Sequence, residues 1–420
     1  MTARTHRGNR NLALAAAAAV AMAACAAAAG GVSATGAGTG AGVSAGAAQR
    51  GPMPQASAPL VQPADFVYQG AFRMSGGTSA KDSFNFGSTA LAWYPAHGTL
   101  LMVGHDWHQQ VAEVEIPQPS GAASPDGLPV AALRQPLTDI LEGRLATIAP
   151  DDNKIGGLLP WNDLVVVSAY NYYDAANRQT KSHFLSSMDF ARRGDVTGPF
   201  RVGTTRPGLV AGYMTPIPAE WQTALGGPAL TGQCCIPIIT RTSFGPSASV
   251  FNPADLGLRD PVPATMLVGY PEDHPELGPC DAGSLVFNCT SAVAGVVFPP
   301  GTRSVLFFGR HGQGKFCYGD VGPGGCVDPA IEDKGPHAYP YVFQIWAYDA
   351  ADLAAVRSGT RKPWSLRPYK VWTFELPFQV PTRDLTGVAY DPATRRVFIA
   401  AGTEGGGRII HVYRLDIAAR

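Results

Sequence analysis

The chain of 420 residues is 45% hydrophobic and only 15% charged, and it contains 49 Gly and 36 Pro. This composition favours an all-β, turn-rich protein and excludes a mainly helical or a disordered one. Its 32 Lys and Arg balance 32 Asp and Glu, so the charge indicates neither nucleic-acid binding nor a polybasic membrane surface.

The first 25 residues have the features of an export signal. Three arginines precede an apolar run at 12–24 that is too short to span a membrane. The run ends in MAAC, which resembles a bacterial lipobox, so we expect Cys25 to be lipidated and to provide the only membrane contact. Ordinary secretory cleavage after an Ala-x-Ala site is the alternative. Either route places the protein outside the cytoplasm, as an envelope lipoprotein or a secreted protein.

Residues 26–58 are nearly all Ala, Gly, Ser, Thr, Pro and Gln, and they predict a flexible tether before a domain at 59–420. A single strand at 65–74 opens that domain. Strand, turn and strand then follow at 88–104, 156–170, 293–309 and 385–402. Third strands begin at 111, 183, 247, 341 and 409, and fourth strands begin at 136, 199, 264 and 369. This order predicts units of four antiparallel strands.

The fifth unit ends at Arg420 without a fourth strand, and the strand at 65–74 fills that place. Five units closed in this way predict a β-propeller, a ring of four-stranded blades. A six-bladed ring is the alternative, because the stretch 212–243 blurs the pattern. The longest helical candidates, such as the segment from Asp349, are short and are expected to connect strands.

Six cysteines remain besides Cys25, and an even number in an exported chain indicates disulfides. The matched spacings favour two small loops, closed by Cys280 with Cys289 and by Cys317 with Cys326. Cys234 and Cys235 would then form a bond between neighbours. Metal binding is the weaker reading, since no CxxC or HxxxH motif accompanies them.

Polar and aromatic residues follow the second strand of every unit. In a propeller, these loops and the connections between units emerge on one face, where they surround the central channel. They are His105, Asp106, Trp107, His108, Tyr170, Tyr172, Arg241, Arg310, His311 and Glu404, with Asp82, Asp152 and Asp384 from the connections. The opposite turns, PAHGT, PWND, PPGTR and DPATR, carry plain turn chemistry. Convergent polar groups around one opening are typical of a binding or catalytic site.

By architecture, residues 65–420 resemble the five-bladed β-propeller superfamily, without a diagnostic motif. Many secreted members act on glycans and others are lectins, so the resemblance implies a carbohydrate-like ligand. A hydrolase of this kind would use paired carboxylates. The candidates for them are Asp82, Asp106, Asp152, Asp384 and Glu404.

The residue types suit a polysaccharide lyase better, and several lyases also resemble propellers. Arg310 and Arg241 would neutralise a uronate carboxylate, while His105 or His311 with Tyr170 would move protons. The alternative is a binding propeller without catalysis, in which Trp107 and Tyr172 stack on the ligand. The remaining ligand-binding candidates are Asp106, His108, Asp384 and Glu404.

Each of these side chains also has a structural reading. His105 and the arginines could tie strands or blades together, and Glu404 could satisfy the amides of a Gly-rich turn. The sequence requires no cofactor and shows no metal motif, although it leaves room for a calcium ion in the channel. We expect a monomer.

Overall fold

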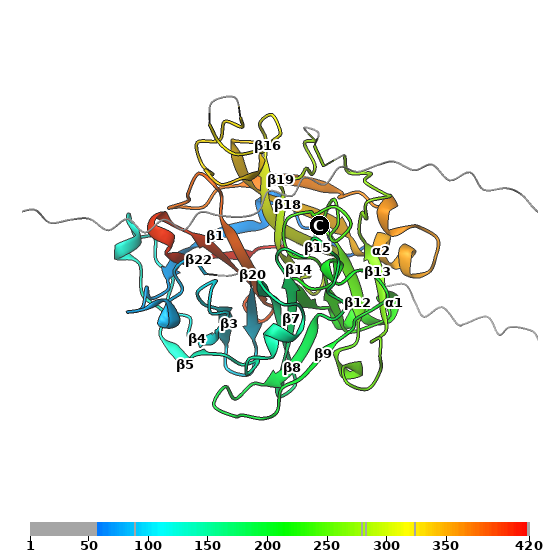
Figure 1. Cartoon of the computed structure of the whole chain (residues 1–420), viewed down its shortest axis with the longest axis horizontal. Coiled ribbons are helices and arrows are strands. Elements are labelled where there is room, and N and C mark those ends of the chain that lie inside the picture. Colours follow the sequence, from blue (N-terminus) through cyan, green and yellow to red (C-terminus); the bar gives the residue numbers. More distant parts are fainter. Residues whose placement is uncertain (1–56, 88–89, 279, 282–283, 323–324, 418–420) are drawn as a thin grey trace, which may run out of the picture. The chain divides into compact units, whose positions relative to one another are not determined.

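A computed structural model describes residues 57–87, 90–278, 280–281, 284–322 and 325–417. The predicted leader, Cys25 and the predicted tether up to residue 56 lie outside these residues. The described chain forms five four-stranded antiparallel sheets in a ring (Figure 1), as the sequence predicts. In this part of the chain, no helix is long and apolar enough to cross a membrane.

We number the five sheets as blades 1 to 5 in chain order, starting each at its innermost strand. Blades 1 and 2 contain β2 (Leu91–Tyr94), β3 (Thr99–Val103), β4 (Val111–Val114), β5 (Leu133–Thr138), β6 (Asn153–Trp161), β7 (Leu164–Asn171), β8 (His183–Ser187) and β9 (Thr197–Phe200). Blades 3 and 4 contain β10 (Met214–Pro216), β11 (Ala229–Thr231), β12 (Ala248–Phe251), β13 (Ala264–Val268), β14 (Ala292–Val297), β15 (Ser304–Gly312), β18 (Tyr341–Asp349) and β19 (Lys370–Phe374). Blade 5 contains β20 (Leu385–Asp391), β21 (Arg396–Gly402), β22 (Arg408–Leu415) and β1 (Phe66–Arg73).

The connections carry short helices and one extra pair of strands. The pair is β16 (Cys317–Gly319) with β17 (Gly335–His337), and the α-helices are α1 (Ala219–Leu225) and α2 (Ala350–Arg357). The 3-10 helices are η1 (Pro63–Asp65), η2 (Ala80–Asp82), η3 (Pro125–Gly127), η4 (Arg144–Thr147), η5 (Pro207–Leu209), η6 (Pro253–Asp255), η7 (Pro363–Ser365) and η8 (Glu404–Gly406). The segment from Asp349 is a connecting helix as predicted, because the Asp349 carboxylate accepts a hydrogen bond from the Ala351 N–H at the start of α2.

Two segments differ from the sequence prediction. The blurred stretch at 212–243 contains the strands β10 and β11, joined by α1 in place of a tight turn, so the described chain forms five blades and not six. The strand expected to begin at 136 instead spans Leu133–Thr138. It ends there because the Asp139 carboxylate accepts hydrogen bonds from the backbone N–H groups of Leu141 and Gly143 and turns the chain.

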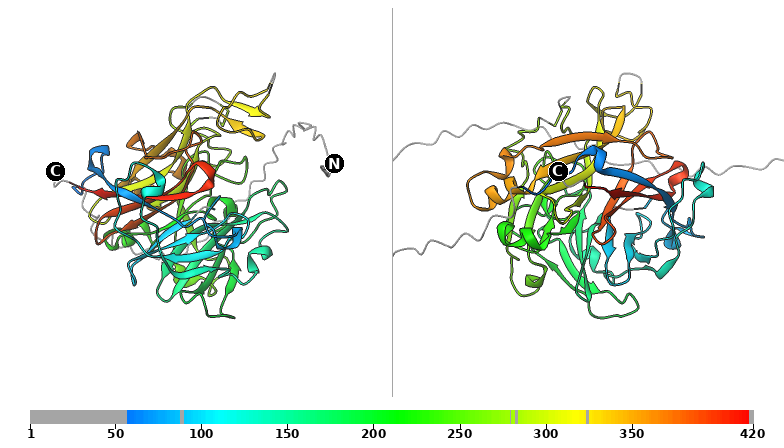
Figure 2. Two further views of the ribbon diagram at one scale, coloured as in Figure 1. Left: turned by 90° about the vertical axis from the view of Figure 1, so that its left-hand side faces the viewer. Right: turned by 180° about the vertical axis from the view of Figure 1, so that it is seen from behind.

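The N-terminal strand closes the ring. β1 pairs antiparallel with β22, in a register that sets Phe66 opposite Leu415 and Arg73 opposite Ile409. Figure 2 shows this blue strand beside the red C-terminal strands. Blade 5 is therefore built from both ends of the domain, as the vacancy in the fifth unit predicts.

Five of the hydrophobic clusters each lie between two neighbouring blades, so both faces of every sheet are buried. Between blades 5 and 1, for example, Phe72, Leu91 and Phe398 pack together. This burial explains why strands such as VLFF in β15 are apolar throughout instead of alternating.

The inner strands pack around the axis at glycine positions. A Cβ on Gly387 of β20 would lie 2.8 Å from the Leu91 Cβ of β2, and a Cβ on Gly295 of β14 would lie 2.6 Å from the Val388 Cβ of β20. The pairing register shifts just before each of these glycines. The close approach therefore requires residues without a side chain.

The ring has two faces with different connections. On the face that we call the loop face, the second strand of each blade ends and the inner strand begins. It carries the β16–β17 pair and the predicted polar residues. On the opposite face, which we call the turn face, the inner strands end in short turns, except where α1 intervenes, and α2 follows β18.

Candidate functional site

Each blade contributes at least one half-buried polar or sulfur-containing side chain to the centre of the loop face. These side chains stand at the start of an inner strand, at the end of a second strand or in the loop that follows it. We call this group the inner ring, and its members are Asp106, Lys154, Tyr170, Cys235, Arg310 and Asp384.

Asp106 and Lys154 join blade 1 to blade 2. The Lys154 Nζ lies 2.5 Å from the Asp106 carboxylate and also donates to the Asp106 carbonyl at 3.2 Å. The adjacent Gln109 accepts a hydrogen bond from the Ile155 N–H at 2.7 Å. Asp106 is thus held by a cation at the opening of the channel, which fixes its direction.

Asp384 and Arg408 join blade 5 to blade 1 in the same manner. The Arg408 Nη1 lies 3.0 Å from the Asp384 carboxylate, and Nη2 donates to the Gly87 carbonyl at 2.8 Å. The Arg408 side chain is only 6% exposed, whereas that of Asp384 is 39% exposed. The predicted ligand-binding residue Asp384 therefore reaches the surface while a buried arginine holds it.

Arg310 lies at the end of β15 in blade 4. Its Nη1 donates to the Thr382 carbonyl at 3.1 Å, and its guanidinium lies 5.2 Å from the centre of the Tyr341 ring. Burial lowers the pKa of Arg310, and the nearby Tyr341 and Asp384 offset only part of this effect. Asp384 from the connection before blade 5 and Tyr172 from blade 2 both raise the pKa of Arg310 electrostatically.

Tyr170 and the Cys234–Cys235 disulfide occupy the side of the ring formed by blades 2 and 3. The Tyr170 hydroxyl lies 3.9 Å from the Cys235 sulfur, and the Cys235 carbonyl accepts a hydrogen bond from the Val293 N–H at 2.9 Å. The second bond attaches the disulfide to the inner strand of blade 4. Sequence spacing gave no sign that Cys235 would enter the ring.

His105 lies in an aromatic cluster beside the inner ring. Its Nδ1 accepts a hydrogen bond from the Trp107 N–H at 3.2 Å, and its ring packs against those of Phe86, Trp107 and His108. Burial lowers the pKa of His105, and the positive charge of His108 lowers it further. This position fits both interpretations of His105, as a structural residue and as a catalytic one.

His311 and Arg241 lie apart from this group. His311 is 2% exposed, accepts or donates a hydrogen bond at 2.8 Å with Ser291, and has its pKa lowered by burial to about 4. Arg241 is half-buried beside Asp174 and Tyr173, and burial lowers its pKa. The two residues predicted to act with Arg310 and His105 therefore stand in separate surroundings.

The remaining carboxylates predicted for a hydrolase are spread around the face. Glu404 is exposed in η8, and Asp152 is exposed before β6. Asp82 accepts hydrogen bonds from Thr78 and Ser79, which lower its pKa.

Large exposed aromatic side chains surround the inner ring. Every one in the described part of the chain lies on the loop face: Phe86, Trp107, Tyr172, Tyr173, Tyr318 and Tyr339. The sequence singled out Trp107 and the tyrosines of blade 2. The sequence did not predict the other three, Phe86, Tyr318 and Tyr339, because they lie in irregular connections that do not repeat from blade to blade.

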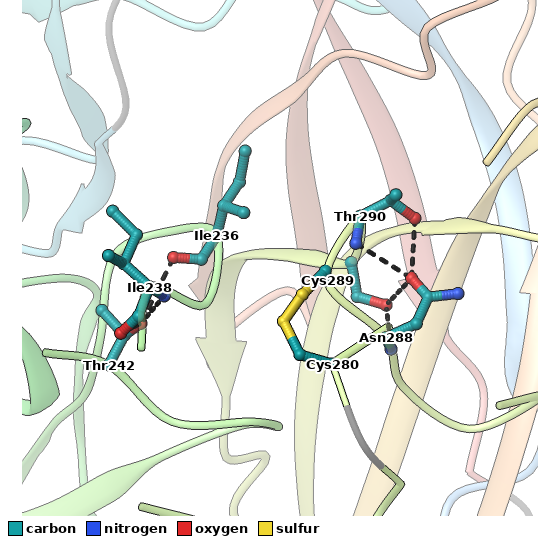
Figure 3. The surroundings of a disulfide bond; sticks show 8 residues. Ile236, Ile238, Thr242, Cys280, Asn288, Cys289 and Thr290 are labelled. Carbon is teal, nitrogen blue, oxygen red and sulfur yellow. Dashed lines mark hydrogen bonds between the residues drawn. A yellow bond between two sulfur atoms is a disulfide. The ribbon is translucent and has the colours of Figure 1, made fainter. Parts of the chain in front are cut away.

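The three predicted cysteine pairs are joined in the structure, and all lie on the loop face. Cys280–Cys289 borders the turn in which the Asn288 side chain accepts hydrogen bonds from Thr290 and Ser291 (Figure 3). In the described residues, no group of three His, Cys, Asp or Glu could hold a metal ion.

Two hollows lie on the turn face, away from the predicted residues. One is an apolar cavity of about 190 Å³ at the ends of the inner strands, to which every blade contributes a proline: Pro95, Pro160, Pro216, Pro300 and Pro392. The other contains Glu113, a buried carboxylate that bonds to His97 at 2.6 Å and to Thr99 at 2.7 Å. The proline after each first strand was the only sequence signal for the apolar cavity.

No protein-family model matches the chain, and no curated protein matches it by sequence. Three solved structures match the chain at low similarity. A luciferin-regenerating enzyme is 7% identical with a TM-score of 0.31, covering 84% of this chain and 94% of its own. MPT-4, a mannose phosphorylase from Leishmania mexicana, is 9% identical with a TM-score of 0.35, covering 83% and 89%. The Dos1 propeller is 10% identical with a TM-score of 0.26, covering 80% and 69%. The protein is a five-bladed β-propeller, and its function has to be argued from its own surface.

Proposed function

We propose that the protein is an extracytoplasmic propeller whose loop face binds a carbohydrate-like polymer. One observation carries the proposal: the exposed large aromatic side chains of the described chain all lie around the polar inner ring. Exposed aromatics cost free energy in water and are retained where they contact a ligand. The inner ring supplies the hydrogen-bonding groups that such a site needs for specificity.

Binding without turnover is favoured over catalysis. A lyase needs a base that removes the C5 proton of a uronate and a cation that neutralises the carboxylate attached to that carbon. Of the residues predicted for these roles, His311 is buried and Arg241 stands beside Asp174. The lyase remains the second candidate because Arg310, a predicted neutralising cation, and Tyr170, a predicted proton carrier, both belong to the inner ring. In either role, the predicted export signal would direct the propeller out of the cytoplasm, and the predicted lipid on Cys25 would hold it at the cell envelope.

The test compares binding by the full chain and by Trp107→Ala, using a panel of neutral and uronate-containing polysaccharides in affinity electrophoresis. Trp107 is 80% exposed, so its removal should leave stability unchanged and weaken binding by about tenfold or more. The matched control is Leu258→Ala on the turn face, because Leu258 is also 80% exposed. Equal affinity of all three proteins for every ligand that binds would refute the proposal.

Incubating the full chain with the same polysaccharides distinguishes binding without turnover from lyase activity. Reducing ends and the ultraviolet absorbance of unsaturated uronates are followed together. We expect neither signal to rise above that of a heat-denatured sample. A rise in both would establish the lyase, and reducing ends alone would indicate hydrolysis.

A further inference from the structure

The inner ring together with the adjacent Arg408 carries one more positive than negative charge. Lys154 pairs with Asp106, and the adjacent Arg408 pairs with Asp384. Among the described residues, no carboxylate oxygen lies within 4.0 Å of Arg310. The rest of the chain contains no Asp or Glu, so no acidic side chain outside the described part can supply the missing partner.

Most of the Arg310 donors have no acceptor in the described part of the chain. A guanidinium carries five N–H groups, and the one side-chain hydrogen bond found is from Nη1 to Thr382. The Nε is buried and has no hydrogen-bond partner. A buried cation whose donors are unsatisfied costs free energy unless an anion completes the site.

The nearby acidic groups are already engaged. The Asp328 carboxylate accepts hydrogen bonds from the Tyr341 hydroxyl at 2.5 Å and from the Ala330 N–H at 2.8 Å, and His337 lies 3.1 Å away. The negative charge of Asp328 lessens the positive potential at Arg310. Asp328 does not accept a hydrogen bond from Arg310, so the other donors of Arg310 stay unsatisfied. Asp384 is held by Arg408.

A second arginine adds positive charge beside the first. Arg383 follows the residue that accepts the Arg310 hydrogen bond, and its guanidinium lies 5.9 Å from the centre of the Phe343 ring. Tyr341 and Phe343 are two residues apart on β18, so the two arginines stack on the same side of that strand. The acidic group closest to Arg383 is Glu375, at 3.9 Å.

We propose that the ligand of the loop face is acidic and that Arg310 binds one of its carboxylates. This inference rests on the proposed binding function and narrows it to polymers that contain uronate. Arginine presents paired N–H donors that fit a carboxylate better than a neutral sugar hydroxyl. The adjacent Tyr172 is exposed, so its ring is available to contact the sugar that carries this carboxylate.

The test measures the affinity of the full chain for polygalacturonate and for its fully methyl-esterified form. The wild-type chain should bind the acidic polymer at least about tenfold more tightly, since an ester removes a charge-assisted hydrogen bond. Arg310→Gln should abolish this difference, and Arg310→Lys should retain part of it. Melting temperatures confirm that each variant is folded.

Arg396→Gln on the turn face is the matched control. Arg396 also lies 5.2 Å from an aromatic ring, that of Phe398, but it pairs with Asp391 at 3.7 Å. This variant should keep the wild-type preference for the acidic polymer.

A thermal-shift assay with free glucuronate, using glucose as the neutral control, separates the two proposals. Protection by glucuronate that requires Arg310, in a chain that binds no polymer, would support the anion site and refute the proposed function. Equal binding of the acidic and esterified polymers, still weakened by Trp107→Ala, would refute the anion site and support the proposed function. No preference for the acidic polymer and no protection by glucuronate would overturn the inference.

Discussion

Buried histidines show how single polar residues are accommodated between the strands. Thr231 donates its hydroxyl proton to the Val210 carbonyl, so the contact at 3.2 Å requires the His183 Nε2–H to donate to the Thr231 oxygen. The Nδ1 of His183 then accepts from the Ser182 hydroxyl at 2.9 Å. Every polar atom is satisfied only if the imidazole is neutral, and burial lowers the pKa of His183 to about 3.

This arrangement predicts that the protein loses stability as the pH falls below about 6.5. The folded pKa of His183 is depressed below its unfolded value, so the unfolded chain binds more protons between pH 6.5 and 3. The free energy of unfolding should fall by roughly 1.4 kcal/mol per pH unit for each such histidine. His183→Asn should make urea unfolding less dependent on pH between 6.5 and 4.5. An unchanged slope would contradict the assignment.

Arg310 and His311 show why the sequence does not predict where single side chains point. Arg310 and His311 both follow the same apolar run, and the sequence placed both at the opening. The strand β15 continues to Gly312, so consecutive side chains still point to opposite sides. Arg310 therefore reaches the inner ring, while His311 is buried against Ser291. Which residue ends a strand cannot be read from composition alone.

At the scale of elements, the inner strands depend on close backbone approach. Gly387→Ala would place a methyl group 2.8 Å from the Leu91 Cβ and 2.9 Å from the Leu91 nitrogen. We expect a loss of about 1–3 kcal/mol in the free energy of unfolding, measured in urea. Gly121→Ala is the control, because no atom lies within 4 Å of its added Cβ. Equal stability of the two variants would refute the packing argument.

The regular elements were predictable because their pattern repeats. Strand, turn and strand recur in segments of similar length, and the DPATR turn occurs as expected, with the Asp391 carboxylate accepting from the Ala393 N–H at 2.9 Å. The irregular elements, α1 and the β16–β17 pair, occur once each. They depend on tertiary contacts such as the hydrogen bond from the Trp221 Nε1 to the Thr302 carbonyl at 2.8 Å, which no local pattern reveals.

For the whole molecule, the closure of the ring by β1 is the feature that joins the two ends of the domain. Phe72 of β1 is fully buried between blades 5 and 1. Phe72→Ala should lower the free energy of unfolding by about 3–5 kcal/mol in urea titrations. Val67→Ala, in the same strand but 37% exposed, should cost less than about 1 kcal/mol. Similar effects of the two changes would contradict closure through β1.

The propeller fold also explains why the two faces differ so much in structure. The turn face is constrained by short turns and by the apolar cavity of about 190 Å³. The loop face carries longer connections, the three disulfides and the exposed aromatics. Loops on a rigid scaffold are where binding groups accumulate. The unequal distribution of polar residues in the sequence predicted this difference between the faces. It did not predict which residues form hydrogen bonds or ion pairs with each polar side chain.

Hydrogen–deuterium exchange of the full chain, with and without its tightest-binding polysaccharide, tests most directly whether the loop face is the binding surface. We predict slower exchange at residues 105–110, 170–174 and 309–312, which lie on the loop face. Exchange at the turns 95–98, 160–163 and 391–395 on the opposite face should not change. Protection confined to those turns would contradict the account and move the ligand to the turn face.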